Sequence, residues 1–343
     1  IMKKNLKDYE LNELKTILGN MGEASYRAGQ IFAWLYKGAE SFEEMKNIPM
    51  ALRERIGEEY STGALHPSLV QVSKIDGTRK YLFELEDGNA IESVFMKYKY
   101  GNTICISSQA GCRMGCRFCA STLDGLCRDL TPGEMSEQLL AVQRDTAERI
   151  THIVIMGSGE PFDNYENVST FLRIAGDPAG LGLSMRNITV STCGIIPGIE
   201  RFTEDFPQVN LAISLHAPTD EARSAIMPVN KKYPLAKLIE ACRRYTDKTS
   251  RRITFEYTLV RGSNDGEEHA ELLADLLRGM LCHVNLIPLN KVKETGLETT
   301  TRKRAENFLA ILKKRRIPST IRRELGDDID GACGQLRLKI KDK

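Results

Sequence analysis

The segment CRMGCRFC, residues 112–119, places Cys112, Cys116 and Cys119 at spacings of four and three residues. Thiolates this close together are typical ligands of a metal ion or an iron–sulfur cluster. A structural zinc site usually has four ligands in two separated pairs, and no second CxxC pair occurs in the chain. A cubane cluster has four irons, so three thiolates leave one iron open to a small molecule. The spacing therefore favours a 4Fe–4S cluster over a zinc loop or three buried structural cysteines.

The overall composition is that of an ordinary globular protein. Hydrophobic residues make up 41% of the 343 residues and charged residues 27%, and no stretch has the ~18 continuous apolar residues of a membrane span. The first residues mix charge with apolar side chains and lack a long apolar centre, unlike a signal peptide. We therefore expect a cytoplasmic protein, where nine cysteines would not build a disulfide framework.

The basic residues are concentrated near the C-terminal end of the sequence. Residues 291–343 contain 15 Lys and Arg against 8 Asp and Glu, a balance of +7, which leaves −5 of the total charge of +2 for the preceding residues. A solvated helix face would explain such a segment. An anionic partner such as RNA is the alternative.

Three parts follow one another along the chain. Apolar residues at helical spacing before residue 60 predict a helical accessory domain over residues 1–65. Short alternating runs separated by IDG and EDG predict a β linker with hairpin turns over residues 66–100. The third part, residues 101–343, alternates β-branched runs with amphipathic stretches.

The alternation in the third part predicts six βα units and hence a parallel α/β sheet, either open and doubly wound or curved into a partial barrel. Polar groups follow four of the runs, and in βα architectures the C-terminal ends of the strands form the active face. We therefore expect GSGEP, STCG, SLH and PLN to meet at one pocket. The runs are TICIS (103–107), HIVIMG (152–157), NITVST (187–192), NLAISLH (210–216), RITFEYTLV (252–260) and HVNLIPLN (283–290).

The cysteine loop resembles that of the radical S-adenosylmethionine (radical SAM) enzymes. Their CxxxCxxC loop commonly has an aromatic residue before the third cysteine, here Phe118, and follows the first strand, here TICIS. The resemblance implies a partial (β/α)6 barrel and a 4Fe–4S cluster whose open iron binds S-adenosylmethionine. It also implies that an electron from the cluster cleaves S-adenosylmethionine to a 5′-deoxyadenosyl radical.

Longer blocks resemble the RlmN family of RNA adenine methyltransferases. They include ESVFMKYKYGNTICISSQAGCRMGCRFCASTLDGLCRDLT, MGSGEPFDNY, STCGIIPGIE, LAISLHAPTDEARSAIMPVN, FEYTLVRGSNDGEEHAELLADLL, CHVNLIPLN and DIDGACGQL. The helical start is similar to the accessory domain of that family. The resemblance implies methylation of C2 of an adenosine in 23S ribosomal RNA and, in some members, also in tRNA.

Three residues acquire catalytic roles from this resemblance. Cys333, in a C-terminal extension of the barrel, matches the cysteine that takes a methyl group from one S-adenosylmethionine, while a second S-adenosylmethionine supplies the radical. Cys105 matches the cysteine that forms a transient disulfide with it as the product leaves. Glu92 matches the proton acceptor, although a glutamate at the end of a strand is otherwise an ordinary surface residue.

The resemblance also implies contacts with S-adenosylmethionine. In the pair Gly159–Glu160 the glycine would allow close approach of the backbone to the cofactor, and the carboxylate would accept hydrogen bonds from the ammonium group. The implied contacts are Gly159, Glu160, Ser191, Ser214, Leu215, His216 and Asn290. The chain departs from the family at Ser158, where methionine or isoleucine is common, and at Cys193, which we expect near the pocket. Cys127, Cys193, Cys242 and Cys282 match no ligand and are expected to be mostly buried.

Alternatives remain at this point. The related Cfr methyltransferases modify C8 of the same adenosine, and Pro161 of GEP favours C2 because GEA is usual in Cfr. A glycyl-radical activase would share the loop without needing Cys105 and Cys333, and a non-catalytic RNA-binding protein would have no use for GSGEP. The family reading implies ribosomal RNA, in some members tRNA, and an electron donor such as flavodoxin or ferredoxin as partners. We further expect no membrane association and a monomer.

Overall fold

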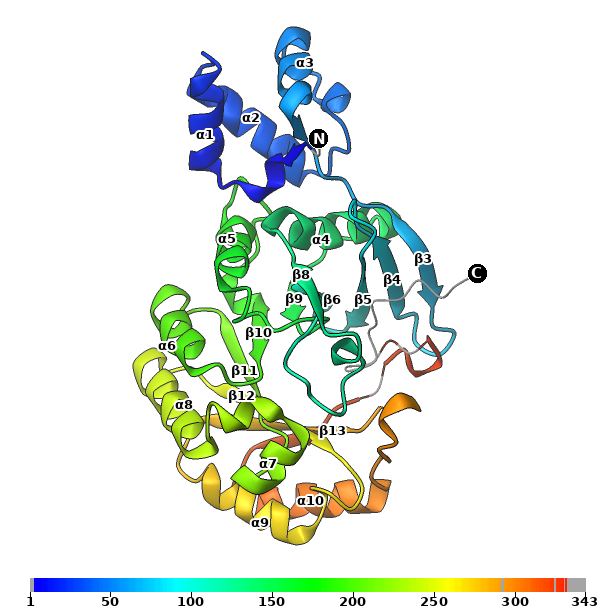
Figure 1. Ribbon diagram of the computed structural model, residues 1–343, viewed down its shortest axis with the longest axis vertical. Coiled ribbons are helices and arrows are strands. Elements are labelled where there is room, and N and C mark those ends of the chain that lie inside the picture. The colour runs from blue at the N-terminus through cyan, green and yellow to red at the C-terminus, as the bar shows by residue number, and fades with distance from the viewer. Residues whose placement is uncertain (1–2, 291–292, 324, 330, 332–343) are drawn as a thin grey trace.

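The computed structural model describes residues 3–290, 293–323, 325–329 and 331. A ten-stranded sheet with the order β14-β13-β12-β11-β10-β9-β6-β5-β4-β3 runs through the molecule (Figure 1). Seven neighbouring strands are parallel, which is the arrangement expected of successive βα units. They are β6 (Gly101–Ile106), β9 (His152–Ile155), β10 (Ile188–Thr192), β11 (Asn210–Ser214), β12 (Ile253–Leu259), β13 (Cys282–Pro288) and β14 (Ser319–Ile321).

The six predicted strand runs are all strands, and β14 is an additional one. Helices connect the parallel strands, and α6, α8, α9 and α10 follow one another around the outside of the sheet (Figure 1). Over the described residues β14 and β3 are the two edges of the sheet and do not pair with each other, so the sheet is open and the prediction of a partial rather than a closed barrel is confirmed. The connecting helices are α4 (Pro132–Thr146), α5 (Tyr165–Gly176), α6 (Ile196–Asp205), α7 (Asp220–Ile226), α8 (Leu235–Thr249), α9 (Glu267–Leu276) and α10 (Arg302–Lys314).

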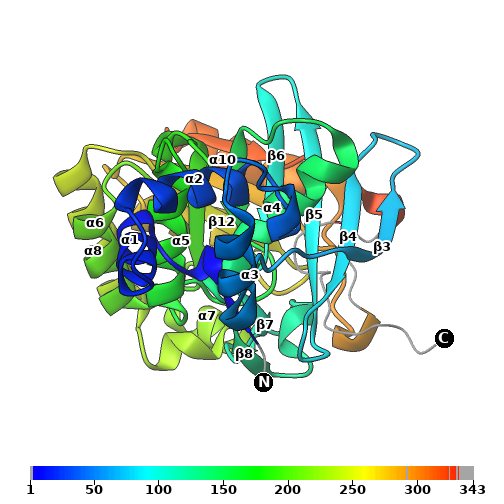
Figure 2. The same cartoon turned by 90° about the horizontal axis from the view of Figure 1, so that it is seen from above.

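The predicted β linker continues the same sheet in antiparallel fashion. Its strands are β3 (Pro67–Val72), β4 (Arg79–Glu84) and β5 (Ala90–Tyr98), and β5 pairs with β6. The IDG and EDG turns lie between these strands, with Gly77 and Gly88 in the left-handed region at φ +75° and +80°. Seen from above, β3 and β4 lie on the side of the molecule opposite α6 and α8 (Figure 2).

Three helices precede the sheet and have their own apolar core. They are α1 (Leu11–Asn20), α2 (Ser25–Tyr36) and α3 (Met50–Glu59). Side chains such as Leu14, Phe32 and Leu52 are buried together, and the same cluster includes Leu140 of α4 and Ile174 of α5. The accessory helices therefore pack directly on the helix that follows the cysteine loop. None of the described helices combines the length and apolar character needed to cross a membrane.

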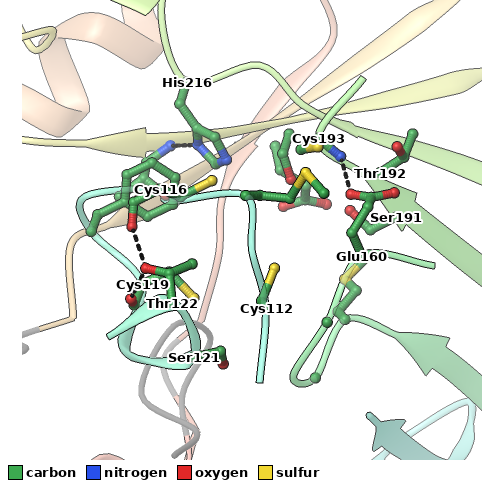
Figure 3. Close-up of a pocket in the computed structure, with 18 of the residues that line it drawn as sticks. Cys112, Cys116, Cys119, Ser121, Thr122, Glu160, Ser191, Thr192, Cys193 and His216 are labelled. Carbon is green, nitrogen blue, oxygen red and sulfur yellow. Dashed lines mark hydrogen bonds between the residues drawn. The ribbon is translucent and has the colours of Figure 1, made fainter. Parts of the chain in front are cut away.

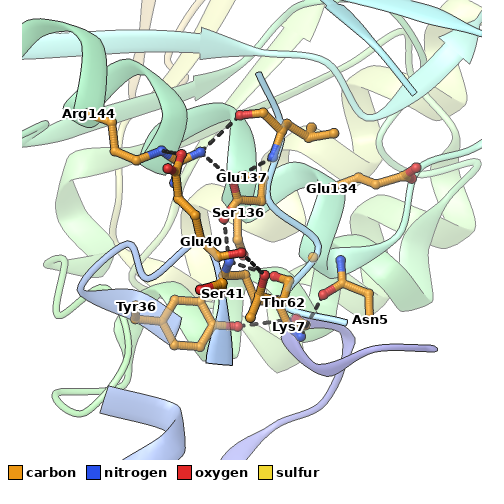
Figure 4. A network of polar contacts seen from close by, with 12 residues as sticks. Asn5, Lys7, Tyr36, Glu40, Ser41, Thr62, Glu134, Ser136, Glu137 and Arg144 are labelled. Atoms are coloured by element: carbon orange, nitrogen blue, oxygen red, sulfur yellow. Dashed lines mark hydrogen bonds and ion pairs between the residues drawn. The ribbon is translucent and has the colours of Figure 1, made fainter. Parts of the chain in front are cut away.

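A buried ionic network reinforces this contact (Figure 4). The side chain of Glu137 in α4 is fully buried and pairs with the Nζ of Lys7, which is also fully buried. Glu137 also accepts from the backbone N–H of Leu65 at 3.0 Å and from Nη2 of Arg144 at 2.8 Å, while Lys7 donates to the carbonyl of Thr62 at 2.7 Å. Removing Glu137 would leave the buried charge of Lys7 uncompensated, so the network fixes how the accessory helices sit on α4.

The pairing register separates the strand residues into two faces. Directly paired residues point to the same face, and alternate residues point to opposite faces. Ile153, Ile155 and Val190 belong to the face that is buried in the main apolar core. The opposite face, here called the polar face, carries several polar side chains from β5, β6 and β10 to β13, with the apolar Val154 of β9 between them. They are Glu92, Cys105, Ser191, Ser214, Glu256 and Asn285.

Candidate functional site

The cysteine loop begins after β6 and is stabilised by hydrogen bonds to its own backbone groups. The N–H of Cys112 donates to the carbonyl of Gly125 at 2.9 Å. The hydroxyl of Thr122 donates to the carbonyls of Cys116 and Cys119 at 3.1 and 2.9 Å. A short hairpin of β7 (Gln109–Gly111) and β8 (Leu126–Asp129), which the sequence pattern did not predict, closes the loop at its base. These contacts orient the three thiols without using their sulfur atoms.

The three thiols of this loop lie around one hollow (Figure 3). Among the described residues, no group of three His, Cys, Asp or Glu side chains is placed to hold a single metal ion. The placement of the three thiols therefore disfavours a single zinc ion. It is compatible with a cubane cluster, in which each thiolate would bind a different iron. Burial raises the pKa of the Cys112 thiol to about 12, so its thiolate form needs a cation at the site.

The predicted polar strand ends line the same pocket as the cysteines. Its wall includes residues from the ends of β9, β10, β11 and β13, as the βα architecture requires. Of the residues predicted from the sequence, it contains Cys112, Cys116, Cys119, Gly159, Glu160, Ser191, Ser214, His216 and Asn290. The expected departure Cys193 also lines it, whereas Leu215, Cys105 and Glu92 do not.

Glu160 is held rigidly by backbone donors. It is buried, and its two carboxylate oxygens accept from the N–H groups of Phe162 at 3.0 Å and Cys193 at 2.7 Å. Burial raises the pKa of this carboxyl group, and the N–H of Cys193 acts in the opposite direction. A positively charged ammonium group in the pocket would compensate the buried carboxylate.

Gly159 makes this placement possible. Its φ of +108° lies in a region that L side chains rarely adopt, and a Cβ there would come within 2.6 Å of the Cβ of Gln109. The side-chain oxygen of Gln109 in turn accepts from the N–H of Glu160 at 2.8 Å. The glycine thus allows the loop after β9 to approach the start of the cysteine loop closely.

His216 has a defined tautomer in the structure. Its Nδ1 accepts from the backbone N–H of Thr258 at 2.9 Å, so the ring proton resides on Nε2. Burial, assisted by the positive charge of Arg223, lowers the pKa of His216 to about 3, and the ring packs on Phe118 with centroids 4.6 Å apart. A neutral Nε2–H donor is therefore available in a pocket that also contains the third cysteine.

Leu215, between two pocket residues, lies in the apolar core. It is fully buried, and its backbone N–H donates to the carbonyl of Glu256 at 3.1 Å. Glu256 itself lines the pocket and was not predicted from the sequence. Its carboxylate accepts from Nδ2 of Asn285 at 2.8 Å, and Arg322 at the end of β14 also lines the pocket. These polar residues share one face of the sheet. That face can be recognised only from the pairing register of the strands, which the sequence pattern does not give.

Cys105 and Glu92 lie on the polar face, on strands next to the pocket. Cys105 is buried beside Val94 in a small cluster that includes Met156, a pocket residue, and Leu325. Glu92 is buried and pairs with Lys80 at 2.9 Å between the oxygen and the nitrogen. Glu92 is therefore part of a buried ion pair rather than a solvated strand end.

The predicted methyl-carrying Cys333 lies outside the described residues. The chain shortly before it is anchored on the turn between β3 and β4. The N–H of Gly326 donates to Oδ2 of Asp76 at 3.0 Å, and the N–H of Lys74 donates to Oδ2 of Asp328 at 2.9 Å. These bonds tie Gly326 and Asp328 to the turn, and the packing of Leu325 places it beside Cys105 of β6 and Val94 of β5.

The other sequence features have mixed outcomes. Cys193, Cys242 and Cys282 are buried as expected, but Cys127 is exposed. Ser158 is buried, and its hydroxyl has no hydrogen-bond partner within the part of the chain that the structure describes. In the basic C-terminal segment several arginines pair with carboxylates, as on a solvated helix face. The pairs are Arg302–Glu306, Arg304–Asp265, Arg315–Glu271 and Arg315–Asp275.

Comparison with known proteins agrees with this geometry. Residues 106–274 match the radical SAM superfamily, and residues 4–61 match the ribosomal RNA large subunit methyltransferase N-terminal domain. The chain is 51% identical to the probable dual-specificity RNA methyltransferase RlmN of Lachnospira eligens. The similarity covers 98% of this chain and 96% of that relative. The corresponding protein of Pelotomaculum thermopropionicum is 53% identical over 98% of this chain and 92% of its own length.

A solved structure extends the similarity to three dimensions. A radical SAM methyltransferase from Sphaerobacter thermophilus is 46% identical, with a TM-score of 0.93 over 97% of this chain and 99% of that protein. Near full-length similarity at this level covers the accessory helices, the cysteine loop and the sheet alike. The chain therefore belongs to the RlmN family of radical SAM methyltransferases.

Proposed function

We propose that this enzyme methylates C2 of an adenosine in 23S ribosomal RNA and, as a second substrate, in tRNA. The observation that carries the proposal is the pocket itself. It combines three thiols, the buried carboxylate of Glu160 and the neutral His216, and it adjoins the sheet face with Cys105 and Glu92. RNA and dual-specificity activity are named for the relatives, and their similarity over nearly the whole chain supports the same substrates here.

The described residues fit the cofactors of the superfamily. Cys112, Cys116 and Cys119 would hold a 4Fe–4S cluster, and Gly159 and Glu160 line the same pocket. When bound, the cluster supplies the electron that cleaves S-adenosylmethionine and so provides the radical. Glu160 would accept hydrogen bonds from the ammonium group, and Ser191, Ser214, His216 and Asn290 would bind the rest of the molecule, whereas the buried Leu215 would support the pocket wall from the core.

The chain itself would supply the remaining steps through two thiols and a carboxylate. Cys333 would carry the methyl group, and loss of one hydrogen atom of that group to the 5′-deoxyadenosyl radical would leave a methylene radical that forms a C–C bond to C2 of the base. Glu92 would take the proton from C2, and the surplus electron of the adduct would return to the cluster. The thiolate of Cys105 would then attack the sulfur of Cys333, so that an S–S bond forms and the S–C bond breaks; the released carbon takes up a proton, which completes the methyl group, and the methylated RNA leaves. A target base must leave its stack to reach such a pocket.

We propose the remaining partners and boundaries on the same basis. The accessory helices of residues 1–65, the β segment of residues 66–100 and the barrel with its C-terminal extension would act as one cytoplasmic monomer. A small electron-transfer protein such as flavodoxin or ferredoxin would reduce the cluster.

The direct test is nucleoside mass spectrometry of 23S ribosomal RNA and tRNA after incubation with anaerobically reconstituted enzyme, reductant and S-adenosylmethionine. Detection of 2-methyladenosine is the expected result for both RNAs. Detection of 8-methyladenosine would refute the C2 assignment, and neither product with an intact cluster would refute RNA adenine methylation.

A second experiment tests the release step. Cys105→Ala should retain the cluster and accumulate a covalent RNA–protein adduct, because the thiol that breaks the S–C bond is missing. Cys242→Ala is a suitable control, since Cys242 is buried in α8 and matches no family ligand. Normal turnover by the Cys105→Ala enzyme would contradict the proposed disulfide step.

A further inference from the structure

Arg223 of α7 is among the largest fully buried side chains of the protein. Its guanidinium makes four hydrogen bonds. Nε donates to the carbonyl of Leu215 at 3.1 Å, and Nη1 donates to Oδ1 of Asn230 at 2.9 Å. Nη2 donates to the carbonyls of Cys193 at 2.6 Å and Ser214 at 3.1 Å. Arg223 thus joins the ends of β10 and β11, which both reach the pocket.

The charge of Arg223 has no direct ionic partner. Its hydrogen-bond acceptors are three carbonyls and one amide oxygen, and no carboxylate within the described ranges lies at ion-pair distance. The closest acidic group in the network is Asp220, whose Oδ1 instead accepts from Asn230 and from the N–H of Leu235, both at 2.8 Å. An arginine remains protonated in proteins, and an unpaired buried charge is costly unless an anion compensates it.

The cysteine loop lies against the helix that carries this charge. The N–H of Arg117 donates to the carbonyl of Ile226 at 3.0 Å. Cys116, Cys193, Ile226 and Met227 form one buried cluster of side chains. Burial lowers the pKa of Arg223, and the thiols of Cys193 and Cys116 are the groups that act most strongly against this effect. The guanidinium therefore lies close to the part of the pocket wall that contains Cys116 and Cys193.

We propose that Arg223 is a positioning residue that provides the counter-charge for the anionic, thiolate-ligated cluster and thereby raises its reduction potential. This inference rests on the cluster assigned above. Three thiolates bring negative charge into a buried site, and the net charge around an iron–sulfur cluster sets its potential. The four hydrogen bonds hold the cation in place, so that it stabilises the reduced cluster, which carries one more negative charge, more than the oxidised one.

The test is a redox titration of the cluster in the holoenzyme, followed by electron paramagnetic resonance. Arg223→Gln should move the midpoint to a more negative value. Loss of one unit charge at a separation of about 12 Å, in an environment with an effective dielectric of about 20, changes the ratio of reduced to oxidised cluster by roughly tenfold, about 59 mV for one electron, and a shorter separation gives a larger change. Arg223→Lys keeps the charge and should stay closer to the wild-type midpoint. Arg144→Gln, in the accessory-domain contact, should leave it unchanged.

The results separate this inference from the assignment of the cluster. Wild-type protein that assembles no 4Fe–4S cluster would refute the assignment, whereas an unchanged midpoint in Arg223→Gln with full iron content would refute only the role of Arg223. If Arg223→Gln fails to retain iron, the Arg223→Lys variant distinguishes a role for the charge from a role for the hydrogen-bond geometry. Retention of the cluster by the lysine variant supports a role for the charge, and its loss there as well would show that only the hydrogen-bond geometry matters.

Discussion

The buried His216 makes a quantitative prediction about stability and pH. In the folded protein its pKa is about 3 because of burial and, secondarily, the positive charge of Arg223, whereas the unfolded value is 6.5. Between these values the unfolded chain binds the proton and the folded protein does not. Stability therefore rises with pH in this window and is lost as the pH falls below 6.5.

The magnitude follows from the two pKa values. At pH 7 both states are largely neutral at this position, and at pH 5 the unfolded imidazole is almost fully protonated while the folded one is still neutral. The linkage relation then gives a loss of about 2 kcal/mol in the free energy of unfolding between pH 7 and pH 5 from this residue alone. Below pH 6 the slope approaches about 1.4 kcal/mol per pH unit.

The assay compares wild-type protein with His216→Asn. The Oδ1 of asparagine can replace Nδ1 as the acceptor for the N–H of Thr258 but does not titrate. Urea unfolding of both proteins without cluster and S-adenosylmethionine, followed by circular dichroism at pH 5, 6 and 7, removes any contribution from ligand binding. The wild type should lose about 2 kcal/mol more than the variant between pH 7 and 5. Equal losses in the two proteins would refute a neutral, desolvated His216.

Three further substitutions test other parts of the structure. Cys116→Ala should abolish iron binding and the visible absorbance of reconstituted protein, whereas the exposed Cys127→Ala should keep both; iron retained in Cys116→Ala would contradict the ligand assignment. Gly159→Ala introduces a Cβ 2.7 Å from a backbone nitrogen at a φ of +108°, so S-adenosylmethionine affinity measured by equilibrium dialysis should fall at least about tenfold, and an unchanged affinity would exclude a close approach there. Glu137→Leu, which leaves the buried charge of Lys7 without its carboxylate, should lower the free energy of unfolding by about 3–5 kcal/mol, and the double variant with Lys7→Met should recover part of it in urea titrations; no recovery would mean that packing rather than the ion pair dominates.

Much of the sheet could be predicted from the sequence because its strands are short β-branched runs that end in polar residues. The strand β14 (Ser319–Ile321) was missed, since three residues between a proline and two arginines carry no detectable alternation. The hairpin of β7 and β8 was also missed. Its pairing depends on the loop that it closes rather than on local periodicity.

The pocket was predicted less completely than the sheet. The cysteines and the strand-end residues are visible because they interrupt apolar patterns. Arg223 is not, because an arginine on a short amphipathic helix is normally solvated, and only the fold places it under the pocket. Glu256 lies within a strand where a single acidic residue usually faces water, and only the register assigns it to the polar inner face.

The anchoring of residues 325–329 has a consequence for motion. These residues are held by the bonds of Asp76 and Asp328 at the turn between β3 and β4 and by the packing of Leu325 on β5 and β6, and as far as the structure describes them they form no strand ladder. Such a contact can open locally at a small fraction of the free energy needed to unfold the sheet. Detachment and return of this segment can therefore occur many times while the rest of the molecule stays folded, and hydrogen exchange should detect it as the amide of Gly326 losing protection long before those of β5 and β6.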